Sequence, residues 1–210
     1  TATSATLNTA TDTQLVTVEA VSAAGAAGAV SITLTAQTEG FSITGGASGD
    51  TLTGGSGDDS FMGFAGADTV TGGAGIDTII LTATSATLNT AADATIATVE
   101  AVSAAGAAGA VSITLTAQTE GFSITGGASG DTLTGGSGAD SFMGFAGADT
   151  VTGGGGVDTI ILTATSATLN TATDAQLVTV EAVSAASAAA AVSITLTAQT
   201  EGFSITGGAS

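Results

Sequence analysis

The sequence predicts an all-β fold, a right-handed parallel β-roll or β-helix solenoid. Three observations support this prediction. An 81-residue repeat runs along the chain, a nine-residue repeat lies inside it, and short segments rich in Val, Ile, Leu and Thr recur at the nine-residue step. Repeats of this kind are typical of solenoids, in which each repeat packs only on its neighbours. We therefore expect half-coils of nine residues, stacked in order along the chain.

The long repeat defines the domain organisation. The string TATSATLNTA begins at Thr1, Thr82 and Thr163, so the copies cover residues 1–81, 82–162 and 163–210, and the third is truncated inside a glycine-rich motif. No proline-rich linker separates the copies, which favours a stiff rod over separate beads. We expect residues 1–210 to form one continuous solenoid that is an excerpt from a longer array.

Two blocks, residues 45–80 and 126–161, each consist of four nine-residue units. Each unit opens on a glycine-rich turn, where Gly tolerates φ > 0, and has an acid at its sixth place. These acids are Asp50, Asp59, Asp68, Asp77, Asp131, Asp140, Asp149 and Asp158. An apolar residue follows two places later and belongs inside a short alternating strand. With upstream positions at the same step, the first copy of this predicted core is Leu34, Ile43, Leu52, Phe61, Val70 and Ile79.

The units resemble the RTX, or haemolysin-type, calcium-binding nonapeptide G-G-x-G-x-D-x-U-x. Residues 54–61 and 72–79 match it at each fixed position, whereas Ser48 at a fourth place and Phe64 at a second place depart from it. The resemblance implies that two nonapeptides make one coil of about 18 residues, with Ca²⁺ between stacked loops. Phe64 and its copy Phe145 are expected to shield a neighbouring loop rather than to anchor a partner.

The resemblance also implies a ligand set for Ca²⁺, a hard cation that takes six to eight oxygens. The ligands are the eight sixth-place Asp residues together with backbone carbonyls of the loops around Gly45, Gly54, Gly63, Gly72, Gly126, Gly135, Gly144 and Gly153. The stacked pairs are Asp50 with Asp68, Asp59 with Asp77, Asp131 with Asp149, and Asp140 with Asp158.

Other acids are treated differently. Asp58 is replaced by Ala139 in the second copy, so the fifth-place acid is not counted as a ligand. Glu19, Glu39 and their copies lie outside the Asp series, and either remain solvated or cap a calcium edge. The alternative for the whole set is that the acids only solubilise turns, but that role does not require a nine-residue step.

The other half of each copy, exemplified by residues 81–125, is predicted to form further coils without metal. The ranges 15–21 and 30–35 are rich in β-branched residues, which favour strands. Residues 23–29 are too short and glycine-containing for a helix. If every coil held 18 residues, one copy would span 4.5 coils, and successive blocks would be half a coil out of phase.

Composition excludes several functions. The chain has 18 acidic residues and no Lys, Arg, His, Cys, Tyr or Trp. Nucleic-acid binding requires cations, and most general bases and nucleophiles are among the missing residues, so we expect neither nucleic-acid binding nor an enzyme. No apolar run approaches the length of a membrane span, so no membrane insertion is expected. Thr pairs repeated every 18 residues are similar to those of some ice-binding solenoids, although Thr is also an ordinary strand residue.

The expected function is a calcium-stabilised extracellular structural scaffold: a stalk, a surface layer or a matrix filament subunit. Its partners would be calcium ions and further copies of itself, and it would be secreted, by type I secretion if the RTX resemblance holds. The alternative is an RTX carrier module of a secreted enzyme whose catalytic domain lies outside this segment.

Overall fold

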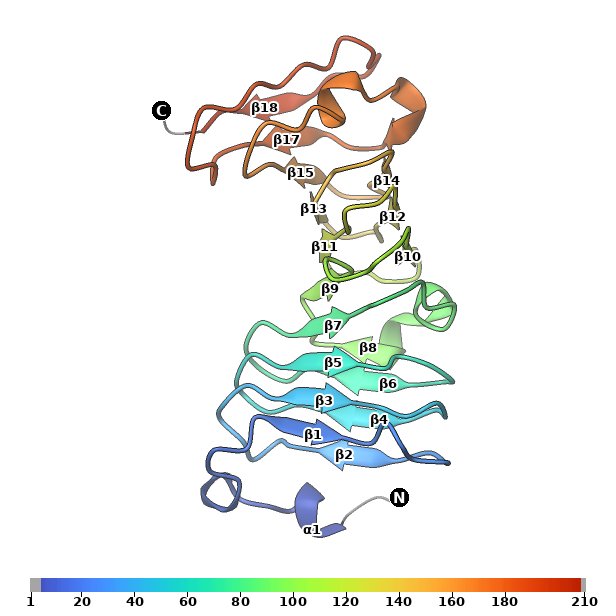
Figure 1. Ribbon diagram of the computed structural model, residues 1–210, viewed down its shortest axis with the longest axis vertical. Helices are drawn as coiled ribbons and strands as arrows, with labels where there is room; N and C mark the ends of the chain where they lie inside the picture. The colour runs from blue at the N-terminus through green and yellow to red at the C-terminus, as the bar shows by residue number, and fades with distance from the viewer. Residues whose placement is uncertain (1–4, 209–210) are drawn as a thin grey trace. The chain divides into compact units, whose positions relative to one another are not determined.

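The computed structural model describes residues 5–208 and contains two compact units. Unit 1 comprises residues 5–81 and 85–102, and unit 2 comprises residues 82–84 and 103–208. Strand β9 (Ala101–Ser103) lies where the chain passes from one unit to the other. In each unit, strands of two or three residues stack in parallel as rungs of a solenoid, which confirms the predicted all-β parallel fold (Figure 1).

Unit 1 has two opposed faces of parallel strands. One face contains β1 (Ala20–Ser22), β3 (Ser42–Thr44), β5 (Ser60–Met62) and β7 (Thr78–Ile80). The other contains β2 (Ser31–Thr33), β4 (Thr51–Thr53), β6 (Thr69–Thr71) and β8 (Ile96–Ala97). Consecutive strands therefore alternate between the faces, as nine-residue half-coils require.

Unit 2 repeats this arrangement. One face contains β11 (Ser123–Thr125), β13 (Ser141–Met143), β15 (Thr159–Ile161), β17 (Ala182–Ser184) and β18 (Ser204–Thr206). The other contains β10 (Ser112–Thr114), β12 (Thr132–Thr134), β14 (Thr150–Thr152) and β16 (Leu177–Val178).

The core of each unit is built mainly from the central residues of the strands, with further buried apolar side chains from the loops and turns such as Phe41, Leu81 and Leu88. Alternation along a strand turns the central residue inward and its two neighbours outward. The six predicted core residues of the first copy are at most 1% exposed, and they are Leu34, Ile43, Leu52, Phe61, Val70 and Ile79. Their burial is confirmed, and so is the 18-residue coil of the block, because Ile43 pairs with Phe61 and Phe61 with Ile79. Leu34 is not a strand centre, however, because it follows β2, whose central residue Ile32 pairs with Leu52 at a step of 20 residues.

Coil length changes outside the blocks. Val21 pairs with Ile43 at a step of 22 residues, and Ile160 pairs with Val183 at a step of 23. With the two 18-residue steps of the block, these four steps equal the 81-residue period. A copy thus has four coils, because the uniform 18-residue coil on which the expectation of 4.5 coils depended does not occur outside the blocks. The extra residues form loops and short turns that a uniform 18-residue coil lacks.

Those extra residues are found mainly in short helical turns. They are α1 (Ala5–Asn8), η1 (Asp12–Gln14), η2 (Leu88–Thr90), η3 (Asp93–Thr95), η4 (Leu169–Thr171) and η5 (Asp174–Gln176). None of the helices among residues 5–208 has the length and apolarity that crossing a membrane requires.

The strand prediction for residues 15–21 is only partly correct. Strand β1 begins at Ala20, and Thr17 adopts a φ of 61°, which interrupts an extended backbone. Residues 23–29 form turns rather than a helix, as predicted. Gly25 and Gly28 have no positive φ and no neighbour within 4 Å of an added β carbon. This explains why Ser187 and Ala190 replace them in the third copy.

Candidate calcium-binding site

The eight sixth-place Asp side chains are buried in the loops between strands. Each is between 0 and 3% exposed, while the fifth-place Asp58 is exposed. The chain has no Lys, Arg or His side chain that could pair with them. Buried charges are normally paired or bound to metals, because removing a carboxylate from water is costly. The loops therefore contain a set of acceptors that lacks a counter-ion.

The carboxylates connect successive coils in two ladders. On one edge of unit 1, Asp68 Oδ1 accepts the Asp50 backbone N–H at 2.7 Å, and Asp50 Oδ1 accepts the Val30 N–H at 2.8 Å. On the other edge, Asp77 Oδ1 accepts the Asp59 N–H at 2.7 Å. Loops n and n+2 are thus stacked, as the resemblance implied.

Unit 2 contains the same two ladders. Asp149 Oδ1 accepts the Asp131 N–H at 2.7 Å, and Asp158 Oδ1 accepts the Asp140 N–H at 2.8 Å. All four predicted pairs are therefore adjacent in the structure, each linked through a backbone amide. The link runs from the backbone of one Asp to the carboxylate of the other because the two loops are stacked one coil apart.

The second carboxylate oxygen usually binds within its own loop. Asp59 Oδ2 accepts the Gly55 N–H at 2.8 Å, and Asp68 Oδ2 accepts the Ala65 N–H at 2.6 Å. An ionised carboxylate offers about four acceptor positions. Two hydrogen bonds consequently leave lone pairs available to a cation.

Backbone carbonyls approach the same oxygens. A β carbon added to Gly54 would overlap both Asp59 Oδ2 and the carbonyl oxygen of Gly72, one coil further on. Gly135 has the same relation to Asp140 Oδ2 and the Gly153 carbonyl. Only Gly leaves this space open, and Ca²⁺ binds oxygens at about 2.3–2.6 Å. The donor set, carboxylate and carbonyl oxygen alone, fits Ca²⁺.

The carbonyls are essential to this interpretation. Among the described residues, no group of three or more acidic, His or Cys side chains is arranged to hold a metal ion. A cation in these loops would consequently depend on one or two carboxylates and several carbonyls. This agrees with the need for Gly, which permits close approach of the backbone.

Burial also affects protonation. Burial raises the pKa of Asp77 and Asp158 to about 6, with further contributions from nearby acids that include Asp59 and Asp140, respectively. It raises the pKa of Asp59, Asp68, Asp140 and Asp149 as well, in each case against the lowering effect of backbone hydrogen bonds. Without a cation, these six carboxyl groups therefore resist ionisation.

Two residue types were not singled out as site residues by the sequence. Glu100 Oε2 accepts the Asp77 N–H at 2.8 Å, and Glu181 Oε2 accepts the Asp158 N–H at 2.8 Å. Each glutamate thus caps the end of one of the two ladders in its unit, which was one of the two alternatives left open. Thr98 and Thr179 precede them at φ of 50° and 49°. The sequence does show the recurring T-V-E string, but it does not indicate that Thr98 and Thr179 adopt a positive φ.

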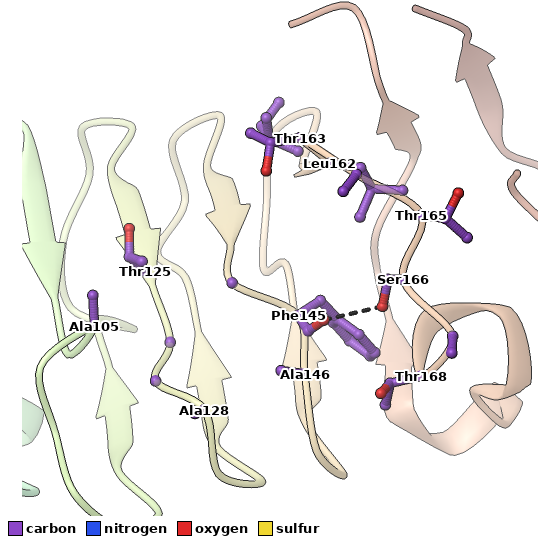
Figure 2. A pocket seen from close by; sticks show the side chains of 16 residues that line it. Ala105, Thr125, Ala128, Phe145, Ala146, Leu162, Thr163, Thr165, Ser166 and Thr168 are labelled. Carbon is purple, nitrogen blue, oxygen red and sulfur yellow. Dashed lines mark hydrogen bonds between the residues drawn. The ribbon is translucent and has the colours of Figure 1, made fainter. Parts of the chain in front are cut away.

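Phe64 and Phe145 are buried at 6 and 7% exposure, consistent with shielding rather than with anchoring a partner. Figure 2 shows Phe145 against residues 162–168, in a groove of unit 2. Its carbonyl accepts the Ser166 hydroxyl at 3.0 Å. The groove is lined by Ala, Gly, Thr, Ser, Ile, Leu and Phe, and none of these lining residues carries an ionisable side chain.

Comparison with protein families agrees with this geometry. The model of the RTX calcium-binding nonapeptide repeat, which spans four copies of the motif, matches residues 44–79 and again residues 125–160. Comparisons with curated proteins and with solved structures give no significant match. RTX nonapeptides are calcium-binding motifs that fold as structural β-rolls. The two glycine-rich blocks of this chain are RTX calcium-binding repeats, and together they make a calcium-binding structural module.

Proposed function

We propose that this chain is part of a calcium-stabilised extracellular scaffold, in which the eight sixth-place Asp residues and the loop carbonyls bind Ca²⁺. One observation carries the proposal: eight carboxylates are buried in stacked loops of a chain that has no cationic side chain. A bound divalent cation between loops would neutralise two carboxylates at once. It would also use the carbonyls that converge on Gly54 and Gly135.

Metal binding would then contribute directly to folding. The core is narrow: most strands bury only their central apolar side chain, and each such side chain contributes about 1.5–3 kcal/mol on burial. Ordering the backbone costs about 1–2 kcal/mol per residue, and a coil contains many residues for each core side chain. Binding energy that is available only to the folded loops offsets part of this cost. We therefore propose that calcium, rather than the core alone, stabilises the blocks.

The repeat favours a scaffold over a carrier. The copies are nearly identical and lack a proline-rich linker, and a full copy contains a whole number of coils. Such copies can extend a continuous solenoid over residues 1–210 and beyond without a change of register. A stalk, a surface layer or a filament subunit uses this property. RTX repeat proteins are typically secreted, which supports an extracellular location.

Far-UV circular dichroism during calcium titration tests the metal dependence. The chain is first treated with chelator, and Ca²⁺ is then added, with Mg²⁺ as the matched control. We expect a cooperative gain of β signal that chelator reverses and that Mg²⁺ reproduces only weakly, since Mg²⁺ demands a more rigid octahedral site. A complete β spectrum in chelator, unchanged by calcium, would contradict the proposal.

Electron microscopy of the calcium-loaded chain tests self-association, which a scaffold uses and a carrier module does not need. Rods that join end to end or side by side in calcium, and separate in chelator, support the scaffold. Isolated particles at all concentrations favour the alternative, a carrier module for an enzyme domain outside this segment.

A further inference from the structure

The last Asp of each block differs from the acids that precede it. The Oδ2 atoms of Asp50, Asp59 and Asp68 each accept a backbone N–H from their own loop. Asp77 Oδ2 accepts none, although the side chain is 0% exposed. Asp158, the equivalent residue of the second block, is also 0% exposed and also has an Oδ2 without a hydrogen bond. A buried, unpaired carboxylate oxygen therefore occurs at the same place in both units.

A threonine from the next coil causes the difference. In the preceding loop on the same edge, the Gly55 N–H donates to Asp59 Oδ2. The corresponding donor for Asp77 is the Gly73 N–H, but it donates to Thr98 Oγ1 at 2.9 Å. In unit 2, the Gly154 N–H likewise donates to Thr179 Oγ1 at 2.9 Å. The Thr hydroxyl thus accepts the glycine N–H that, in the preceding loop, donates to the carboxylate.

The same threonine directs its carbonyl toward the unpaired oxygen. Thr71 pairs with Ala97, so Thr98 stacks on Gly72 and occupies the place of a first glycine. A β carbon added to Gly72 would overlap both the Thr98 carbonyl oxygen and Asp77 Oδ2. This repeats the arrangement of Gly54, Asp59 and the Gly72 carbonyl. Positive φ is unfavourable for a β-branched residue, yet Thr98 has a φ of 50° in this position.

The surroundings are negatively charged. Glu100, whose carboxylate accepts the Asp77 N–H, lies beside the pair, and the backbone N–H of Asp59 donates to Asp77 Oδ1 on the opposite side. Two oxygens that converge without a hydrogen between them repel each other unless a cation lies there. Thr98-Val99-Glu100 is consequently equivalent to a shortened calcium loop, with Thr in the place of the first Gly and Glu in the place of Asp.

We propose that each block binds one further Ca²⁺ ion beyond its nonapeptide loops, between Asp77 Oδ2 and the Thr98 carbonyl, and between Asp158 Oδ2 and the Thr179 carbonyl. Glu100 and Glu181 supply additional negative charge at these sites, and water completes the coordination. The proposal rests on calcium binding by the blocks. It goes further because one ligand of each ion, the Thr98 or Thr179 carbonyl, lies in the linking half, the part of each copy outside the nonapeptide block. The ion would therefore connect the last calcium loop to the first coil that lacks the motif.

Anomalous diffraction from crystals of the chain grown in calcium locates the ions directly. We expect density peaks between the nonapeptide loops and one additional peak in each unit, coordinated by Asp77 and Thr98 or by Asp158 and Thr179. Filled nonapeptide loops with no ion at these two places would overturn this inference and leave the proposed function intact. Absence of calcium from all loops would instead contradict the proposed function.

Native mass spectrometry with calcium titration provides a test in solution. The double variant Glu100→Gln with Glu181→Gln retains an acceptor for the Asp77 and Asp158 N–H groups but removes two charges. We expect two of the bound ions to become roughly tenfold weaker, because calcium affinity depends on the charge of the site. The matched control is Glu19→Gln, since Glu19 ends the same T-V-E string but no glycine-rich loop precedes it in this chain. Equal calcium binding by both variants would overturn the inference.

Discussion

The calcium blocks and the linking half stack their coils alike, but different polar groups join the loops. In the blocks, buried carboxylates accept backbone N–H groups from neighbouring coils. In the linking half of the first copy, Asn8 Oδ1 accepts the Thr33 N–H at 3.0 Å and Asn8 Nδ2 donates to the Ser31 carbonyl at 3.1 Å. Gln37 Nε2 donates to the Ala10 carbonyl at 2.9 Å.

The difference is one of chemistry. An amide both donates and accepts and remains neutral, so Asn8 satisfies two backbone groups, whereas a carboxylate only accepts and carries charge. Asp12 also joins coils in the linking half of the first copy, but it is only half-buried, and hydrogen bonds from Thr38 lower its pKa. Burial instead raises the pKa of Asp77. The comparison teaches that neutral amides join coils in the linking half, whereas the blocks bury carboxylates for which the chain has no cationic side chain.

The largest expected effect comes from removing calcium. Hydrogen exchange read by mass spectrometry should show loss of protection in residues 45–80 and 126–161 when chelator is added. Residues 5–37 should lose much less, because Asn8 and Gln37 maintain their bonds without metal. Uniform loss of protection over the whole chain would show that the two regions unfold together, and it would contradict the proposed difference in their dependence on calcium.

A smaller effect is expected from adding one methyl group at matched glycines. Gly54→Ala places a β carbon against Asp59 Oδ2 and the Gly72 carbonyl, so the calcium concentration at half-folding should rise more than tenfold, or about 1.4 kcal/mol. Gly25→Ala in the linking half meets nothing within 4 Å and should be neutral or stabilise by about 0.4–1 kcal/mol. Circular dichroism with calcium titration measures both. A similar response of the two variants would contradict the assignment of calcium to the block loops.

The smallest effect should come from pH in the absence of calcium. The pKa of Asp77 and Asp158 is raised from 3.8 to about 6 in the folded chain, so the folded state binds protons more tightly than the unfolded state. Stability of the calcium-free chain should therefore fall as pH rises from about 4 to about 6. Thermal unfolding in chelator at pH 5 and pH 7 measures this, and we expect the higher melting temperature at pH 5.

The calcium-loaded chain should respond in the opposite direction. Protons compete with Ca²⁺ for the same carboxylates, so its midpoint for calcium should rise as pH falls below about 6. A calcium-free melting temperature that rises from pH 5 to pH 7 would contradict the origin of these pKa values in burial.

Much of the block could be predicted from the sequence alone, because its nine-residue step has no insertions. That step determines which residue of each strand points inward, as Phe61 and Ile79 show, and which acids stack at 18 residues, as Asp59 and Asp77 show. A regular coil repeats its backbone, so sequence spacing translates directly into spatial neighbours.

Only the tertiary structure decided the rest. Coils of 22 and 23 residues depend on which side chains of the linking half find partners across coils, as Asn8 does with strand β2. The positive φ of Thr98 and the unpaired Oδ2 of Asp77 likewise depend on one hydrogen bond, in which the Gly73 N–H of the preceding coil donates to the Thr98 hydroxyl. Residue type and spacing do not specify such competition for a donor, because it is resolved only when the coils are packed together.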